Sequence, residues 1–211
     1  MARRSDPRLL VLHGLRLKAV AEPPAVAEAV GLTASDVADE LTALEAAGLV
    51  VHRTGALTGW SLTPAGRTAH EVLLAAEAEI TAVRGMVEAA YGGFRRLNPR
   101  VLDVCSRWQV RHRGGRPVRN DHADAAYDRA VVGELAAVHA DATPVCDRLG
   151  GALDRYRPYG PRLGHAVERV RAGDTDWFTK PAIPSYHTVW FELHEDLLAT
   201  LGLDRAGEVG P

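Results

Sequence analysis

The sequence predicts a mainly α-helical protein in which three helices, a small β-hairpin and a fourth helix precede an all-helical C-terminal domain. Three observations support this fold class. Apolar residues recur three and four positions apart along most of the chain, the period of an amphipathic helix. Two short strand-like runs, 49–53 and 58–62, are separated by a four-residue connection. The length of 211 residues suits one large or two small domains, and we predict two, 1–75 and 76–211.

The first two helices are delimited by an apolar stripe, by proline and by glycine. Three leucines spaced three apart lie on one side of the helix predicted for 7–19. Pro23 begins the second helix, because proline lacks the N–H that a first helical turn leaves unused. Gly31 ends this helix.

The third helix begins at a hydroxyl cap and leads into the hairpin. Thr33, followed by Asp36, forms an approximate capping box. Gly48 suits a left-handed cap at the end of the helix. The two strand-like runs follow and are joined through 54–57. Thr63 then caps a fourth helix whose first residue is a proline.

The rest of the chain is predicted as helices and one loop. The fourth helix is expected to continue to about residue 90, where Tyr91-Gly92-Gly93 breaks it, and its apolar seam predicts lengthwise packing on another helix. We expect Asn98-Pro99 to interrupt the helix over 94–110, and Pro144 to kink or divide the one over 121–149. The remaining segments are a loop at 111–120 and helices at 161–173 and 185–201.

The N-terminal element order is that of a winged helix-turn-helix domain, and its sequence carries a family resemblance. The stretch Leu44-Glu45-Ala46-Ala47-Gly48-Leu49-Val50, with the hairpin and Leu62-Thr63-Pro64-Ala65-Gly66-Arg67, closely resembles the MarR and PadR families of bacterial winged-helix regulators. The resemblance covers residues 9–71. It implies that the stretch 44–50 ends the recognition helix, that the hairpin is the wing, and that 62–67 leads into the next helix. It also implies a transcriptional regulator that binds double-stranded DNA.

Charge argues against the DNA function that the resemblance implies. The outward positions of the third helix are acidic or hydroxylic, and the first 75 residues carry seven basic and eight acidic side chains. DNA affinity depends largely on neutralised phosphates. One alternative is therefore a winged-helix protein- or ligand-binding module that does not bind DNA, and another is a helical enzyme with a vestigial winged helix. The predicted DNA-binding residues are Arg8, Thr33, Ser35, Thr42, His52, Arg53 and Thr54.

Arginines are densest outside this region. Eight of them face a single acid, Asp103, between Phe94 and Arg119. The loop from Arg111 to Arg119 could contact DNA or another anion, or it could be flexible and solvated, balanced by the acids that follow: Asp121, Asp124 and Asp128. We favour the second hypothesis, because charge runs commonly pair locally.

The C-terminal domain places aromatic residues beside two histidines. His187 and His194 share a face of the last helix that borders its apolar side, so both point partly inward. Apolar walls with a few convergent polar groups suit a small-molecule pocket. An effector bound in this pocket would tilt the long fourth helix. The alternative is a packed helix–helix core. The predicted ligand-binding residues are Trp108, Tyr127, Tyr186, His187, Trp190 and His194.

No other chemistry has a recognisable pattern. His187 and His194 are two helical turns apart, about 10.5 Å, which is too far for a shared ion, and no spacing matches a metal site. Cys105 and Cys146 fall on apolar faces, so we expect buried, inert thiols. In the absence of catalytic or cofactor motifs we predict no enzymatic activity, no metal and no cofactor.

Composition favours a soluble protein. The net charge is −2, and no apolar run approaches the roughly 20 residues that span a bilayer. Charged residues such as Arg16 interrupt the N-terminal apolar run before the core of a signal peptide forms. We therefore expect a cytoplasmic protein with no membrane partner. Our leading hypothesis is a MarR/PadR-like transcriptional regulator, a homodimer with a small-molecule effector in its helical domain.

Overall fold

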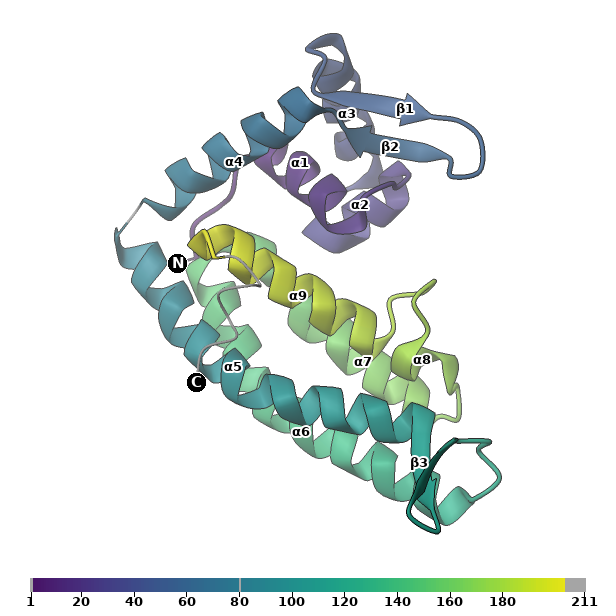
Figure 1. The fold of residues 1–211 in the computed structure, drawn as a ribbon. Coiled ribbons are helices and arrows are strands. Elements are labelled where there is room, and N and C mark those ends of the chain that lie inside the picture. Colours follow the sequence, from purple (N-terminus) through teal and green to yellow (C-terminus); the bar gives the residue numbers. More distant parts are fainter. Residues whose placement is uncertain (1, 80, 204–211) are drawn as a thin grey trace. The chain divides into compact units, whose positions relative to one another are not determined.

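The computed structural model describes residues 2–79 and 81–203 and is mainly helical in that part of the chain (Figure 1). Two separate antiparallel pairs of strands accompany the helices. The chain divides into two compact units, and this division does not coincide with the domain boundary predicted after residue 75. Unit 1 comprises Met1–Glu88, Leu149–Pro158 and His194–Pro211, and unit 2 comprises Ala89–Arg148 and Tyr159–Leu193.

The first three helices of unit 1 begin and end where local signals predict. They are α1 (Pro7–Lys18), α2 (Pro23–Val30) and α3 (Ala34–Ala46). Gly31 ends α2 with a left-handed φ of 74°, a conformation that glycine adopts without steric cost. The Thr33 hydroxyl accepts a hydrogen bond from the backbone N–H of Asp36 at 3.1 Å, as an N-cap should.

The predicted hairpin and the start of the fourth helix are confirmed. Strand β1 (Val50–Arg53) pairs antiparallel with β2 (Gly59–Leu62). The helix α4 (Pro64–Ala78) is capped by the Thr63 hydroxyl, which accepts from the N–H of Gly66 at 3.0 Å. Gly66 is required there, because a Cβ would collide with the Leu49 carbonyl.

An apolar core joins these elements of unit 1. The apolar stripe of α1 contributes Val11, Leu12 and Leu15, all at most 1% exposed. α3 contributes one face alone, so its opposite face lies at the surface. The core cluster comprises Leu10, Val11, Leu12, Leu15, Ala21, Val26, Ala27, Ala29, Val30, Val37, Leu41, Leu44, Val50 and Leu62.

The predicted continuation of the fourth helix to about residue 90 is wrong. α4 ends at Ala78, and a new helix, α5 (Thr81–Gln109), begins three residues later. α5 also continues through Gly92-Gly93 and Pro99, where we expected breaks. Glycine and proline cost a helix roughly 1 and 3 kcal/mol, and buried residues on one side of α5 outweigh that cost. Gly93 also suits the packing, since a Cβ there would lie 3.0 Å from Val145.

The C-terminal part is not all-helical, which corrects a second prediction. Strand β3 (Val110–Arg113) pairs antiparallel with β4 (Arg116–Arg119), where we predicted a loop. The turn consists of Gly114 and Gly115, whose φ angles are 58° and 78°. Two consecutive positive φ angles are what a tight two-residue hairpin turn requires.

In the described chain, the three remaining long helices lie close to their predicted ranges, whereas two short ones, at 154–156 and 176–179, were not predicted. α6 (Ala125–Ala152) is a single helix that includes Pro144, so of the two expected outcomes, a kink or a division into two helices, the division is wrong. Buried residues on both sides of Pro144, Ala142 and Val145 among them, support the helix across this position. The later elements are η1 (Asp154–Tyr156), α7 (Tyr159–Arg171), α8 (Asp176–Thr179) and α9 (Tyr186–Leu201).

Candidate functional site

The outer face of α3 and the neighbouring hairpin form the first candidate surface, within unit 1. α3 buries Val37, Leu41 and Leu44, and this stripe turns the opposite side of the helix toward solvent. The exposed polar side chains there carry hydroxyl or carboxylate groups and no positive charge. They include Ser35, Asp36, Asp39, Thr42 and Glu45.

All seven predicted DNA-binding residues are exposed, and six of them lie on two adjacent elements. Three belong to α3 or its cap, and three belong to the end of β1 and the turn after it. Arg8 lies in the first turn of α1, and no hydrogen bond or ion pair links its side chain to the other six in the described chain. The six residues on adjacent elements are Thr33, Ser35, Thr42, His52, Arg53 and Thr54.

The two basic side chains of the hairpin already have partners. The Nε of Arg53 donates to the Ser61 hydroxyl at 2.7 Å. The Nε2 of His52 lies 3.3 Å from a carboxylate oxygen of Glu22. DNA phosphates would therefore compete with existing contacts at this surface, and the acidic face of α3 would add repulsion.

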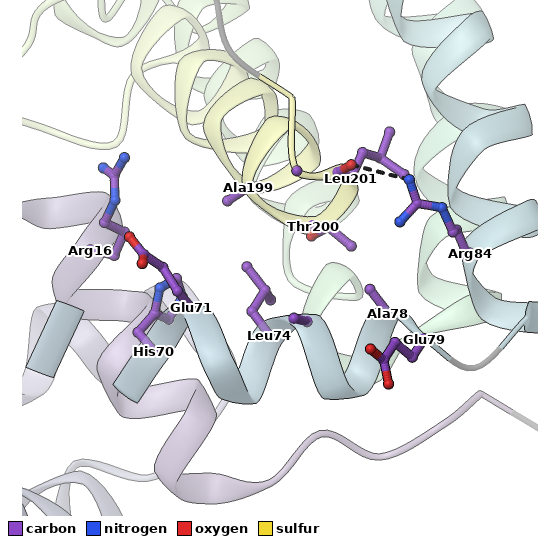
Figure 2. A pocket seen from close by; sticks show the side chains of 12 residues that line it. Arg16, His70, Glu71, Leu74, Ala78, Glu79, Arg84, Ala199, Thr200 and Leu201 are labelled. Atoms are coloured by element: carbon purple, nitrogen blue, oxygen red, sulfur yellow. Dashed lines mark hydrogen bonds between the residues drawn. The ribbon is translucent and has the colours of Figure 1, made fainter. Parts of the chain in front are cut away.

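A pocket of about 410 Å³ is the second candidate site, also within unit 1 (Figure 2). Side chains from α1, α4, the start of α5 and the end of α9 line it. Arg16 and Arg84 supply positive charge, Glu71 and Glu79 supply negative charge, and Leu74 forms part of an apolar wall. Arg84 also donates to the Leu201 carbonyl at 3.3 Å. The lining suits a small ligand that carries both polar and apolar groups.

His70 connects this pocket to a buried polar network. Its Nε2 lies 3.0 Å from Nδ1 of His13. One of these two nitrogens donates a hydrogen bond and the other accepts it. The opposite ring nitrogen of His13 lies 3.1 Å from Oδ2 of Asp196, an ion-pair distance. His13, His70 and Asp196 are each at most 2% exposed.

Arg155 forms the other half of the network. Its guanidinium donates to Glu77 at 3.0 Å, to Asp196 at 2.5 Å and to the Thr200 hydroxyl at 2.8 Å. Thr200 also lies 2.8 Å from the hydroxyl of Tyr156. Three donors of one guanidinium are thereby satisfied, which buried charge requires.

The network shifts the titration of its members. Burial, with the proximity of His13 next in importance, lowers the pKa of His70 from 6.5 to about 3, so this imidazole is neutral at neutral pH. Burial alone would raise the pKa of Asp196, but Arg155 and His13 outweigh it and hold the pKa well below its usual range. A neutral histidine therefore lies beside an ionised carboxylate network.

Sequence reasoning missed this network. Its members are scattered among apolar helical stretches, and each resembles an isolated polar residue. One signal was available: His13 interrupts the run Leu9-Leu10-Val11-Leu12 on a helix whose buried side is otherwise apolar. No group of three or more His, Cys, Asp or Glu in the described residues is arranged to hold a metal ion.

The structure does not bring the six predicted ligand-binding residues together. Tyr186 and Trp190 are buried, with ring centroids 6.4 Å apart. Trp108 packs against Phe178 at 4.4 Å, and no ring contact or hydrogen bond in the described chain joins it to Tyr186 or Trp190. The hydroxyl of Tyr127 donates to the Arg107 carbonyl at 2.9 Å. His187 is half-buried in unit 2, and His194 is buried in unit 1.

The arginine-rich stretch pairs with acids at several positions, and one of these pairs, Arg111 with Asp124, is of the local kind that we favoured. Arg111 donates to Asp124 at 2.9 Å, and Arg107 donates to Glu134. Arg100 donates to Asp141 at 2.7 Å. These pairs are all within unit 2.

Comparison with known proteins adds no identification. The chain matches no family model, no curated protein and no solved structure. In the part of the chain that the structure describes, no helix is long and apolar enough to cross a membrane.

Proposed function

We propose that this protein is a winged-helix transcriptional regulator, with α3 as the recognition helix and the β1–β2 hairpin as the wing. The observation that carries the proposal is the order α1, α2, α3, β1, β2, α4 around one apolar core, with the outer face of α3 left exposed. A recognition helix must present such a face to the major groove. The exposure of all seven predicted contacts supports the same function.

The chemistry of the α3 face indicates which contacts it would make. Hydroxyls such as those of Ser35 and Thr42 can bond to base edges, and a carboxylate such as Asp39 can accept from the amino group of cytosine. Phosphate contacts would come from Arg8 and Arg53. A second copy of the chain would double these cations, so the proposal includes a homodimer.

Fluorescence anisotropy with DNA from the protein's own upstream region, over a salt series, tests this proposal. Two arginines per copy predict a slope of about −4 for log K against log salt in a dimer. A complex that prefers this DNA over a scrambled duplex, with a slope of that size, supports the regulator. The absence of any complex at low salt, from protein whose circular dichroism shows it to be folded, overturns the DNA function.

A matched pair of variants examines the role of the α3 face. Asp39→Asn removes one negative charge from it and should strengthen binding to the scrambled duplex several-fold, because the repulsion of phosphates falls. Asp147→Asn makes the same chemical change at an exposed position of unit 2 and should leave binding unchanged. Equal effects of the two substitutions would mean that α3 does not face the DNA.

The acidic face of α3 favours a second candidate function, recognition of a basic protein segment without DNA binding. Asp36, Asp39 and Glu45 are exposed on one helix, and no cation accompanies them there. Such a surface attracts positive partners and steers their approach. An arginine-rich peptide that binds the wild-type chain but not Asp39→Asn, together with no DNA complex, would establish this function instead.

We place a small-molecule effector of this regulator in the unit 1 pocket beside His70. Its lining joins α1 and α4 to the end of α9 and meets the buried network at His70 and Thr200. A ligand there can alter DNA affinity only if it binds two arrangements of these helices unequally. Effector candidates that lower DNA affinity in the wild type and not in Arg16→Gln would support this location.

A further inference from the structure

Unit 2 contains a separate pocket of about 560 Å³. It is lined by the end of α5, the base of the β3–β4 hairpin, and the segment 175–181. Its volume lies within the range of roughly 300–1,000 Å³ typical of small-molecule sites. Among its lining residues are Trp108, from our predicted ligand-binding set, and a histidine, His122, with an acidic partner.

His122 and Asp128 form a hydrogen-bonded pair with a defined tautomer. The Nδ1 of His122 lies 3.0 Å from Oδ2 of Asp128. The amide nitrogen of Asn120 is 3.2 Å from the same Nδ1, but its two hydrogens go to the Trp108 carbonyl at 3.1 Å and to the other Asp128 oxygen at 2.8 Å. The proton between His122 and Asp128 therefore belongs to Nδ1. In the neutral ring, Nε2 then carries a lone pair directed away from Asp128.

Further contacts hold His122 in position. Its backbone has a left-handed φ of 57°, which is uncommon outside glycine. The side-chain oxygen of Asn120 accepts from the backbone N–H of His122 at 3.3 Å. The imidazole also packs on Trp108, with ring centroids 4.5 Å apart. Asn120 is only 3% exposed, so this support is internal to the fold.

The same pocket carries a positive charge balance. Arg119 and Lys180 line it, and Asp176, which pairs with Lys180 at 2.6 Å, is its acidic lining residue. No hydrogen bond or ion pair in the described chain engages the guanidinium of Arg119. An anion in the pocket would thus meet one uncommitted arginine, one lysine whose partner is solvent-exposed, and the lone pair of His122.

We propose that this pocket binds a small oxyanion, a carboxylate or a phosphate, that also bears a hydroxyl donor. The anionic oxygens contact Arg119 and Lys180, and the hydroxyl donates to Nε2 of His122. Asp128 and Asn120 are positioning residues that hold the imidazole in the accepting tautomer. The site belongs to unit 2 alone, so it stands whether or not unit 1 binds DNA.

Inorganic phosphate is a suitable probe, because dihydrogen phosphate carries both anionic oxygens and O–H donors. Two-dimensional ¹⁵N NMR of the histidine rings in the full chain reads the tautomer directly, with His122→Gln to assign the signal. In the neutral form of the His122 ring, we expect the proton on Nδ1 and none on Nε2. We also expect a saturable shift of Nε2 on titration with phosphate and none with chloride at equal ionic strength.

Two arginines of β4 provide a matched comparison. Arg119→Gln, in the pocket, should weaken phosphate binding by about threefold to tenfold. Arg116→Gln, exposed on the same strand and outside the pocket lining, should leave it unchanged. Asp128→Asn should lose the Nδ1–H tautomer; if that variant fails to fold, the arginine pair still decides. Equal effects of the arginine substitutions, a non-saturable shift, or a neutral His122 ring that carries its proton on Nε2 would overturn the proposal.

Discussion

Arg155 donates to Asp196 across 2.5 Å in the interior of unit 1, although 41 residues separate them in the sequence. Each side chain is 1% exposed. Arg155 also satisfies Glu77, so one guanidinium compensates two buried carboxylates. Arg155 lies in η1, Glu77 in α4 and Asp196 in α9, so these two ion pairs join three elements that no local sequence signal links.

Arg155→Met should therefore destabilise the protein strongly. The substitution leaves Asp196 and Glu77 buried without their cation, which typically costs about 3–5 kcal/mol in the free energy of unfolding. Urea denaturation followed by circular dichroism measures this. Arg157→Met, whose side chain is 61% exposed beside Asp154, is the control and should change stability by less than about 1 kcal/mol. Comparable losses in the two variants would refute the importance of the buried network.

Stability should fall as the pH is lowered from 6.5 toward 3, because of His70. Burial lowers its pKa in the folded state to about 3, whereas the unfolded chain titrates near 6.5. Between these values the unfolded state binds a proton that the folded state excludes, so acid favours unfolding. The loss from this group alone should reach the order of 2 kcal/mol at about pH 5.

The depressed pKa of Asp196 acts with the same sign at lower pH. Its carboxylate stabilises the fold above its unfolded pKa of 3.8, and that contribution is lost as the pH falls through the folded value. Urea midpoints from pH 7 to 4.5 follow His70 and not Asp196, because Asp196 stays ionised there in the folded state. Burial also lowers the pKa of His139 and of His187, which add a loss of the same sign. His70→Gln should therefore reduce the pH dependence, and His112→Gln, exposed on β3, should retain the wild-type slope.

Trp190 should behave as a core residue. It is 2% exposed, stacks on Phe94 with centroids 4.4 Å apart, and donates from Nε1 to Asn98 at 3.0 Å. Trp190→Ala should cost about 3–5 kcal/mol in the free energy of unfolding. Trp190→Phe keeps an aromatic ring and should cost less. A Trp190→Ala protein of unchanged stability that has lost a ligand-induced thermal shift would restore our original pocket hypothesis.

Both cysteines should resist thiol reagents in the folded protein. Burial raises the pKa of Cys105, and likewise that of Cys146, to about 12, so the reactive thiolate is scarce at pH 8. A chromogenic disulfide reagent should label neither thiol until guanidinium unfolds the chain. Ser106→Cys places a thiol at an exposed neighbouring position and should react at once. Rapid labelling of the wild type would show that the cysteines are accessible.

The local boundaries of unit 1 follow from the sequence by itself. Thr33 and Thr63 cap helices, and Gly31 ends one, because each contact involves residues within about one helical turn of one another. The hairpin at β1 and β2 follows in the same way from two short runs and a turn. The α-helical class and the exposed acidic face of α3 were likewise predictable, since both depend on periodicity.

Only the tertiary structure determined the features that depend on residues distant in the sequence, namely the continuity of α5 and the buried ion-pair network. α5 continues through Gly93 and Pro99 because buried contacts outweigh the weak local preference to stop. The network of His13, Arg155 and Asp196 exists because folding removes three separated segments from water together, and a buried charge is then stable only beside its counter-charge. A sequence pattern cannot supply that pairing, whose energy comes from groups that meet only in the folded chain.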